Sequence, residues 1–170
     1  RRWPGSPIPR RWTGRGRSEW VEPKAAEPTG EEPSNVSLYQ TEGIVLSQTP
    51  LGENDKIITL LSPEEGLVRA VVKGARKPKS RLSAVTQPFT RASFQLSRGK
   101  SLDRVIQVSL KISHPGILSD YAKVVCASYV SELVAELSPE KQQNREQFWF
   151  FSSVLDHLEQ REDPWVVVKW

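Results

Sequence analysis

The residues 73–81 hold the densest group of chemically active side chains in the sequence: five cations and no acid. The cations are Lys73, Arg76, Lys77, Lys79 and Arg81. Like charges this close repel each other, so such a segment is most stable beside an anion. A polynucleotide, with a phosphate at every nucleotide, matches a run of cations well. The alternative is a solvated loop whose charges only favour solubility, as most charge runs do.

Four further cations lie close to this run in the sequence: Arg69, Arg98, Lys100 and Arg104. Arg69 precedes the run on the same predicted strand, and the other three belong to a predicted hairpin that follows it. On one face of a small barrel, such residues would form a positive groove that follows a phosphate backbone. We therefore predict that all nine cations bind a nucleic acid. Tyr39, Phe89 and Phe94 are the candidates for stacking on bases, with Phe94 expected in the core and Phe89 possible as an exposed ring.

The elements around the run predict how it is held. Gly74 and Pro78 oppose helix formation, so the run is predicted to be a loop. A β-branched segment, residues 67–72, comes directly before it and predicts a strand. Alternation along this strand separates two faces. One face carries Val68, Ala70 and Val72, and the other carries Arg69, Val71 and Lys73.

Five segments have the pattern of strands. They are residues 38–47, 56–61, 67–73, 90–97 and 106–112. Gly43 is expected to allow a bend or bulge in the first strand, and Gly66 to supply the positive φ of the hairpin turn before the third. Five strands in one compact stretch suit a closed barrel of the oligonucleotide-binding (OB) type. We therefore predict an OB-fold domain over residues 38–113.

The apolar period then changes to about 3.6, which predicts helices in residues 114–170. One face of the first helix is expected to carry Ala122, Cys126, Tyr129, Leu133 and Leu137. The second is expected to begin after Asn144, with Gln147 returning the cap bond. Its apolar stripe is Phe148, Phe151, Leu155 and Leu158. A third helix is expected to open near Asp163, so the sequence predicts the start of an all-α domain that is truncated.

Residues 1–37 are rich in Pro, Gly, Arg and Glu and predict a disordered arm. Its first half, basic and acid-free through Arg17, is typical of an organellar transit peptide or of an arm that binds nucleic acid. Upstream sequence without function is the third alternative, so the arm is assigned no role. The 170 residues carry a net charge of +4, which favours an anionic partner. No run reaches the length of a membrane span, so a soluble protein is expected.

No catalytic or metal-binding pattern emerges from the sequence. His114 and His157 lie far apart, and neither has a cysteine or carboxylate pair at the spacing of metal ligands. Cys126, the single cysteine, lies on a predicted apolar helix face and suits a core position. We therefore expect a binding protein and not an enzyme.

Several segments resemble the bacterial RecO family. They are Glu42–Leu46, Gly52–Leu61, Gly66–Arg81, Gln87–Phe89, Arg98–Lys100 and Ala127–Tyr129. The resemblance covers about residues 38–170 and leaves the arm unexplained. Gly66–Arg81 is its most specific part, since ordinary OB barrels share no such sequence.

The resemblance implies a recombination mediator in DNA repair. Members of this family have an N-terminal OB barrel and a helical C-terminal domain, bind single- and double-stranded DNA, and anneal complementary strands. They act with RecR, and often RecF, to load RecA on strands coated by single-stranded-DNA-binding protein (SSB). By position, the resemblance places the cations of residues 73–81 on the DNA-contacting surface. It also implies a bacterial, nucleoid-associated, cytoplasmic location, with organellar import as the alternative.

The chain departs from the family pattern in two ways. Many members continue well past the equivalent of Trp170, and some carry a four-cysteine zinc site there; with Cys126 alone, no metal or other cofactor is predicted here. The family's SSB-tail pocket lies in the helical domain, so partner binding by this chain stays open. An RNA-binding OB module of translation and a protein-interaction scaffold stay open as other functions.

Overall fold

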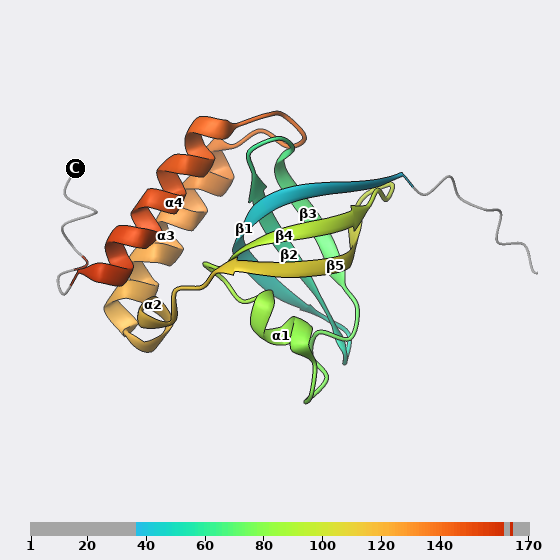
Figure 1. The fold of residues 1–170 in the computed structure, drawn as a ribbon, viewed down its shortest axis with the longest axis horizontal. Helices are drawn as coiled ribbons and strands as arrows, with labels where there is room; N and C mark the ends of the chain where they lie inside the picture. The colour runs from blue at the N-terminus through green and yellow to red at the C-terminus, as the bar shows by residue number, and fades with distance from the viewer. Residues whose placement is uncertain (1–36, 162–163, 165–170) are drawn as a thin grey trace, which may run out of the picture. The chain divides into compact units, whose positions relative to one another are not determined.

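A computed structural model describes residues 37–161 and Pro164, and its central feature is a closed barrel (Figure 1). The strands are β1 (Leu38–Leu51), β2 (Asp55–Ser62), β3 (Gly66–Val72), β4 (Arg91–Ser97) and β5 (Asp103–Ile112). They follow the hydrogen-bonded order β1-β2-β3-β5-β4, and β4 returns to β1. Every neighbouring pair is antiparallel except β3 and β5, which are parallel. This confirms the predicted five-stranded OB barrel followed by helices.

Four helices occur in the described part of the chain. They are α1 (Arg81–Val85), α2 (Pro115–Ser119), α3 (Tyr121–Leu137) and α4 (Arg145–Gln160). Figure 1 shows α1 beneath one end of the barrel, whereas α2, α3 and α4 lie together beside it. The sequence did not predict α1 and α2, because five residues are too few to show a helical period. None of the four is long and apolar enough to cross a bilayer.

Two predictions fall on residues that the structure does not describe. The predicted arm lies outside the described residues except for Ser37, and the third helix expected near Asp163 also lies outside them.

The barrel interior follows the alternation read from the sequence. On β3, Val68, Ala70 and Val72 are buried and Arg69 is exposed, which confirms the two predicted faces. The interior cluster draws on every strand. Its buried members are Val45, Ile58, Leu60, Val68, Ala70, Val72, Ala75, Ala92, Phe94, Leu96 and Val105. Because the inward phase of β3 is fixed by this core, its outward phase is fixed as well.

A second hydrophobic core joins the barrel to the helices. From the barrel side it contains Ile44, Leu46, Leu61 and Phe89. From α4 it contains the predicted stripe of Phe148, Phe151, Leu155 and Leu158, all fully buried. The backbone amide of Gln147 donates to Asn144 Oδ1 at 3.3 Å, which confirms the predicted N-cap of α4. The barrel and the helices therefore share one continuous apolar contact.

The predicted apolar face of α3 is wrong over its second half. Tyr129, Leu133 and Leu137 are exposed, and the buried positions there are Ser131 and Val134. With Cys126 and Ala127, these side chains form a face of mostly small residues toward the shared core. Small side chains allow close approach of the helix backbone, and this geometric advantage outweighs the larger apolar area of the opposite face.

Two irregularities in the strands also differ from the prediction. The bulge in β1 lies between Val45 and Ser47 and not at Gly43. A second irregularity lies where Leu96 of β4 faces Val105, so Ile106 leaves the alternation and is half exposed. Leu110 and Ile112 are exposed too, because β5 meets β3 only at its first two residues and has β4 alone beside its later half.

Gly66 lies where the β2–β3 hairpin meets the segment between α3 and α4. Its φ of +65° confirms the predicted turn conformation. A Cβ atom at this position would lie 2.3 Å from the Gln142 carbonyl oxygen and 2.7 Å from that of Pro139. The neighbouring Leu67 amide donates to the Pro139 carbonyl at 3.3 Å. Only glycine fits both the backbone angle and the close approach.

We expect Gly66→Ala to lower the free energy of unfolding by about 3–4 kcal/mol, because strain and a clash with backbone act together. Gly52→Ala is the matched control: its φ is +59°, but no atom lies within 4 Å of the added Cβ. It should cost only about 1–2 kcal/mol. Urea denaturation measures both, and equal losses would contradict the role assigned to the junction.

Candidate nucleic-acid interface

The cationic loop, residues 73–81, leaves the end of β3 and leads into α1. Its five cations are all exposed. The β1–β2 turn holds its first residues. The Gly74 amide donates to Asp55 Oδ1 at 2.8 Å, the Arg76 amide donates to the Asn54 carbonyl at 2.9 Å, and Arg76 Nη1 donates to the Gly52 carbonyl at 2.5 Å. The backbone of the loop is therefore anchored while its charges point outward.

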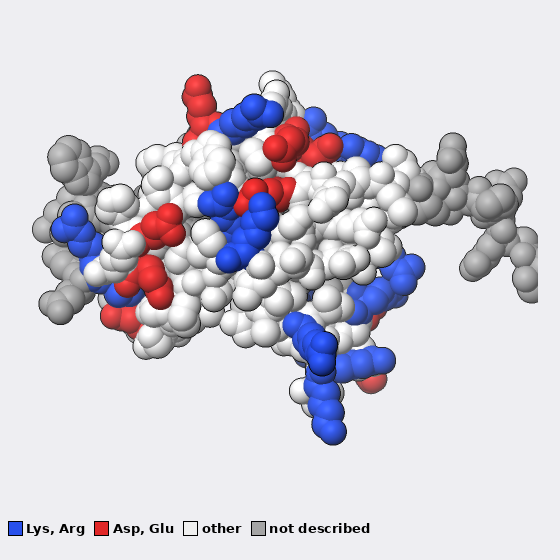
Figure 2. Space-filling view, viewed as in Figure 1, with Lys and Arg blue, Asp and Glu red and all other residues white. Residues whose placement is uncertain are grey.

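Only one carboxylate balances these five cations among the described residues. Lys73 Nζ lies 3.0 Å from Asp55 Oδ2, and no other loop cation forms an ion pair there. Hydrogen bonds from the Gly74 amide and from Lys73 lower the pKa of Asp55 below its usual value. Figure 2 shows the resulting concentration of Lys and Arg at the lower edge of the molecule, where Figure 1 places α1 and the loop before it.

The outer face of β3 continues the positive surface upward from the loop. Arg69 faces Thr59 of β2, and Arg104 of β5 lies beside Val71. Both arginines are exposed and neither forms an ion pair within the described residues. Lys73 lies two positions beyond Val71. Arg69, Arg104 and Lys73 therefore form a row along the β3–β5 seam, the line where β3 and β5 pair.

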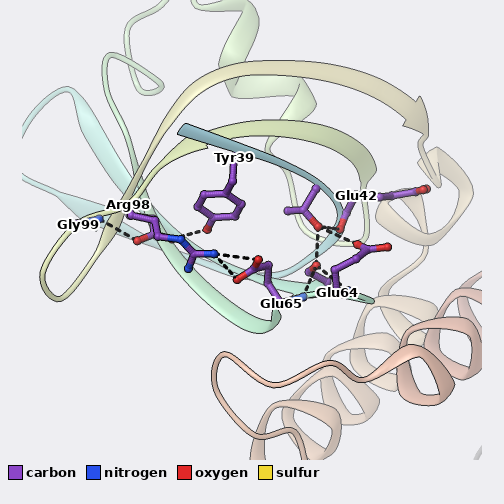
Figure 3. A network of polar contacts seen from close by, with 9 residues as sticks. Tyr39, Glu42, Glu64, Glu65, Arg98 and Gly99 are labelled. Atoms are coloured by element: carbon purple, nitrogen blue, oxygen red, sulfur yellow. Dashed lines mark hydrogen bonds and ion pairs between the residues drawn. The ribbon is translucent and has the colours of Figure 1, made fainter. Parts of the chain in front are cut away.

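The β4–β5 turn contributes less free charge than predicted. Arg98 Nη2 contacts both oxygens of Glu65, at 2.9 and 3.0 Å, and its guanidinium lies 4.3 Å from the Tyr39 ring centroid. Figure 3 shows Tyr39, Glu65 and Arg98 of this group. The Tyr39 hydroxyl donates to Asp103. Burial and that bond raise the pKa of Tyr39 well above its usual value. Arg98 is thus charge-matched inside a polar network, whereas Lys100 is exposed without such a partner in the described residues.

The nine predicted cations therefore lie in a band and not in one cluster. β5 begins beside Ala70, so the turn before it lies toward the start of β3, and the cationic loop lies at the other end. Lys73 lies four positions after Arg69, which corresponds to about 13 Å along a strand. That length is several times the spacing of about 3.4 Å between phosphates along one strand of double-stranded DNA.

The three aromatic candidates offer little for base stacking. Phe94 is buried in the barrel, as predicted. The alternative of an exposed Phe89 is wrong: the ring is 3% exposed in the shared core, and its backbone, at φ +65°, bonds to Val45. Tyr39 is half-buried and has Arg98 against its ring. The surface is therefore electrostatic in character.

The sequence reasoning missed Lys56, a buried lysine beneath the loop. Its ammonium donates to Gln48 Oε1 at 2.7 Å and to the Thr86 carbonyl at 3.1 Å. Desolvation lowers its pKa. The alternation of β2 contained the signal, because Lys56 shares its phase with the inward residues Ile58 and Leu60.

The histidines have structural surroundings. His114 is buried, with Nδ1 2.7 Å from the Phe89 carbonyl and Nε2 3.2 Å from Asp156. His157 is exposed on α4. No group of three or more His, Cys, Asp or Glu side chains in the described residues could hold a metal ion.

Comparison with known proteins identifies the family. A family model described as "Recombination protein O N terminal" matches residues 36–113, and "Recombination protein O C terminal" matches residues 118–168. The chain belongs to the RecO family. The proteins named DNA repair protein RecO from Synechococcus elongatus and Bacillus subtilis are similar to it. They are 42% identical over 121 residues and 40% identical over 130 residues.

The similarity covers much of this RecO-family chain and less of its relatives. The alignments cover 71% and 76% of this chain, and 46% and 51% of the Synechococcus and Bacillus proteins. The chain thus spans about half the length of the curated relatives it matches. The N-terminal match ends with the barrel, so the cationic loop and β3–β5 seam lie entirely within it.

The Asp55 anchor predicts a pH dependence. Because the folded-state pKa of Asp55 is lowered, its carboxylate stabilises the fold above the unfolded pKa of about 3.9, and this contribution is lost as pH falls through the folded pKa. Asp55→Asn keeps an oxygen for the Gly74 amide but loses the charge. The difference in unfolding free energy between the two proteins should therefore shrink below about pH 4.

An NMR titration of the Asp55 carboxyl provides the direct measurement. Its midpoint should lie below about 3.9 in the wild type. Lys73→Gln should raise it only partway, since the Gly74 amide still donates. Two outcomes would contradict the role assigned to Asp55: a midpoint at the ordinary value, or a loss of unfolding free energy in Asp55→Asn that stays constant from pH 7 to 3.

Proposed function

We propose that this RecO-family protein binds DNA in recombinational repair and acts as a mediator without catalytic activity. The observation that carries the proposal is the cationic loop: five exposed cations, one balancing carboxylate, and a backbone anchored to the barrel. The names of the relatives support DNA repair as the process. A rigid array of unmatched positive charge gains most from replacing the counterions of a polynucleotide.

The location of the loop supports the same proposal. OB folds bind oligonucleotides on the outer face of the second and third strands and on the loops beside it. Here that face includes Arg69, with the Asp55-anchored loop at one end and the β4–β5 turn at the other. We propose that DNA lies along this band and contacts Arg69, Lys100, Arg104 and the five loop cations. Arg98, already matched by Glu65, would support the turn and contact DNA only weakly.

Binding of this kind predicts weak sequence preference. Phosphate contacts position a nucleic acid but do not read its bases, and the aromatic candidates of the sequence analysis are buried or covered. Both single- and double-stranded DNA are therefore suitable ligands. A surface that neutralises phosphates also reduces the repulsion between two strands, which is the physical basis for annealing them.

The finer steps of mediation belong to the same proposal. We propose that the protein promotes annealing and RecA loading on SSB-coated DNA, together with RecR, RecF and SSB. A bacterial, nucleoid-associated, cytoplasmic location follows from this role. These steps rest on the resemblance to the RecO family, and the barrel surface supports only the DNA-binding step.

The triple variant Lys77→Gln, Lys79→Gln, Arg81→Gln tests the loop. These side chains form neither an ion pair nor a hydrogen bond that anchors the loop in the described structure, so the fold should persist. Each lost phosphate contact reduces the slope of log affinity against log salt by about 0.7 for single strands. We expect the slope for a single-stranded oligonucleotide to become shallower by about 2, with an affinity loss of at least about tenfold at ~100 mM salt.

The matched control removes three exposed cations that lie outside the band, with Lys111→Gln, Arg145→Gln and Arg161→Gln. Net charge changes equally, so this control separates local contact from the general field of the protein. Its slope should change by less than about 0.5. Fluorescence anisotropy between ~50 and ~200 mM salt gives the slope for the wild type, the loop variant and the control. Equal changes of slope in the loop variant and the control would contradict the assignment of the loop to DNA binding.

Annealing tests the next step. Complementary labelled strands should anneal faster with the wild-type chain than without protein, and the triple variant should lose most of this gain. Competition with a structured RNA gives the discriminating measurement. Stronger binding to the RNA than to single-stranded DNA would replace the repair proposal with an RNA-binding function.

A further inference from the structure

A pocket of about 270 Å³ lies between the β1–β2 region, the cationic loop and α1. Its lining residues are Gln48, Thr49, Pro50, Lys56, Ala75, Arg76 and Ser83. One water needs only about 15 Å³ of such space, so the pocket has room for a larger polar group. The lining contains two cations and no carboxylate.

Lys56 forms the buried side of this pocket. It is 5% exposed, and its two hydrogen-bond acceptors are neutral: the Gln48 amide oxygen and the Thr86 carbonyl. An ammonium has three donors, so its hydrogen-bonding capacity is not filled by these two acceptors. The adjacent Asp55 does not neutralise it, because strand alternation sends that carboxylate to the other face, where it binds Lys73.

Buried charges in proteins are ordinarily paired with an opposite charge, because an uncompensated charge loses its hydration. Lys56 departs from that pattern, as its lowered pKa reflects. Arg76 adds a second cation from the exposed side, where Nη1 already donates to the Gly52 carbonyl. The Ser83 hydroxyl is also available at the lining. An anion in the pocket would supply the charge that the protein itself does not.

We propose that this pocket binds a phosphate group, between Lys56 on the buried side and Arg76 and Ser83 on the exposed side. Two sources can supply this phosphate group: a DNA backbone held by the cationic loop, in which case the inference rests on the proposed function, or a free phosphate. A tetrahedral oxyanion suits the site because it accepts several hydrogen bonds from donors that converge from different directions.

Inorganic phosphate is the first probe. At ~10 mM and with ionic strength matched by chloride, it should raise the Tm of the wild-type chain by about 3 °C. Lys56→Met, which keeps a long side chain and removes the charge, should abolish this shift. Lys123→Met is the matched control, because Lys123 also donates to a main-chain carbonyl, that of Glu159, but does not line the pocket. It should keep the full shift.

Ser83→Glu tests the same pocket without altering its buried residue. Ser83 is exposed on α1, so the variant should fold, and its carboxylate would occupy the anion position and abolish the phosphate shift. Ser83→Ala should retain most of it. The pocket does not bind phosphate if phosphate leaves the Tm of the wild type unchanged, or if it raises the Tm of the wild type, Lys56→Met and Ser83→Glu equally. In either case Lys56 serves only to link Gln48 and Thr86 by hydrogen bonds.

A single-stranded oligonucleotide is the second probe and identifies the source of the phosphate. Loss of one backbone contact in Ser83→Glu or Lys56→Met should make the salt slope shallower by about 0.7. A phosphate shift without this change supports the pocket and assigns it to a free phosphate. If the wild type binds no DNA yet keeps a Lys56-dependent phosphate shift, the proposed function fails and the pocket stands. The reverse result overturns the pocket alone.

Discussion

Repulsion within the cationic loop is the constraint on which the rest of this structure depends. Five positive side chains follow one another within nine residues, and free chain would spread them apart. The barrel opposes this spreading with three hydrogen bonds to the loop. The Asp55 carboxylate accepts from the Gly74 amide, the Asn54 carbonyl accepts from the Arg76 amide, and the Gly52 carbonyl accepts from the Arg76 guanidinium. Because two of these three acceptors are neutral carbonyls, the loop is positioned with little loss of charge. An array that is both ordered and largely unmatched is what a phosphate backbone can bind without a large ordering cost.

The barrel can position the loop because its own strands are fixed from two sides. On the inside, the buried residues of β3 pack in the barrel core, and alternation then directs the remaining side chains outward. Arg69 and Lys73 therefore share the outer face without any other contact being needed to orient them. Outside, the shared core fastens β1 and β2 to α4, and Gly66 allows the β2–β3 hairpin to approach the α3–α4 segment closely. Movement of the helices would therefore be transmitted to the hairpin that leads into β3. The helices support the proposed interface from the opposite end of that strand.

Sequence alone predicted those features that depend on residues close together in the chain. The five strands, the faces of β3, the turn at Gly66 and the cap at Asn144 each follow from a few neighbouring residues. The failures involve choices that depend on distant partners. The buried face of α3 is decided by how closely small residues such as Ala127 and Ser131 approach the shared core, and Phe89 is buried by helices that lie further along the chain. Of the site, the cationic loop could be predicted, but the pairing of Arg98 with Glu65 across 33 residues could not.

Neighbouring residues Asp55 and Lys56 show how the same alternation creates both proposed sites. A strand sends adjacent side chains to opposite faces, so the acid and the lysine cannot pair with each other. The carboxylate goes outward and matches one of the five loop cations, whereas the ammonium goes inward and meets only neutral acceptors. If their positions were exchanged, the buried face would carry a negative charge and the loop would lose its anchor. The observed order leaves the Lys56 ammonium without an ion pair on the inward face and matches only one of the five loop cations on the outward face. Both faces lie next to the loop that we propose binds the DNA backbone.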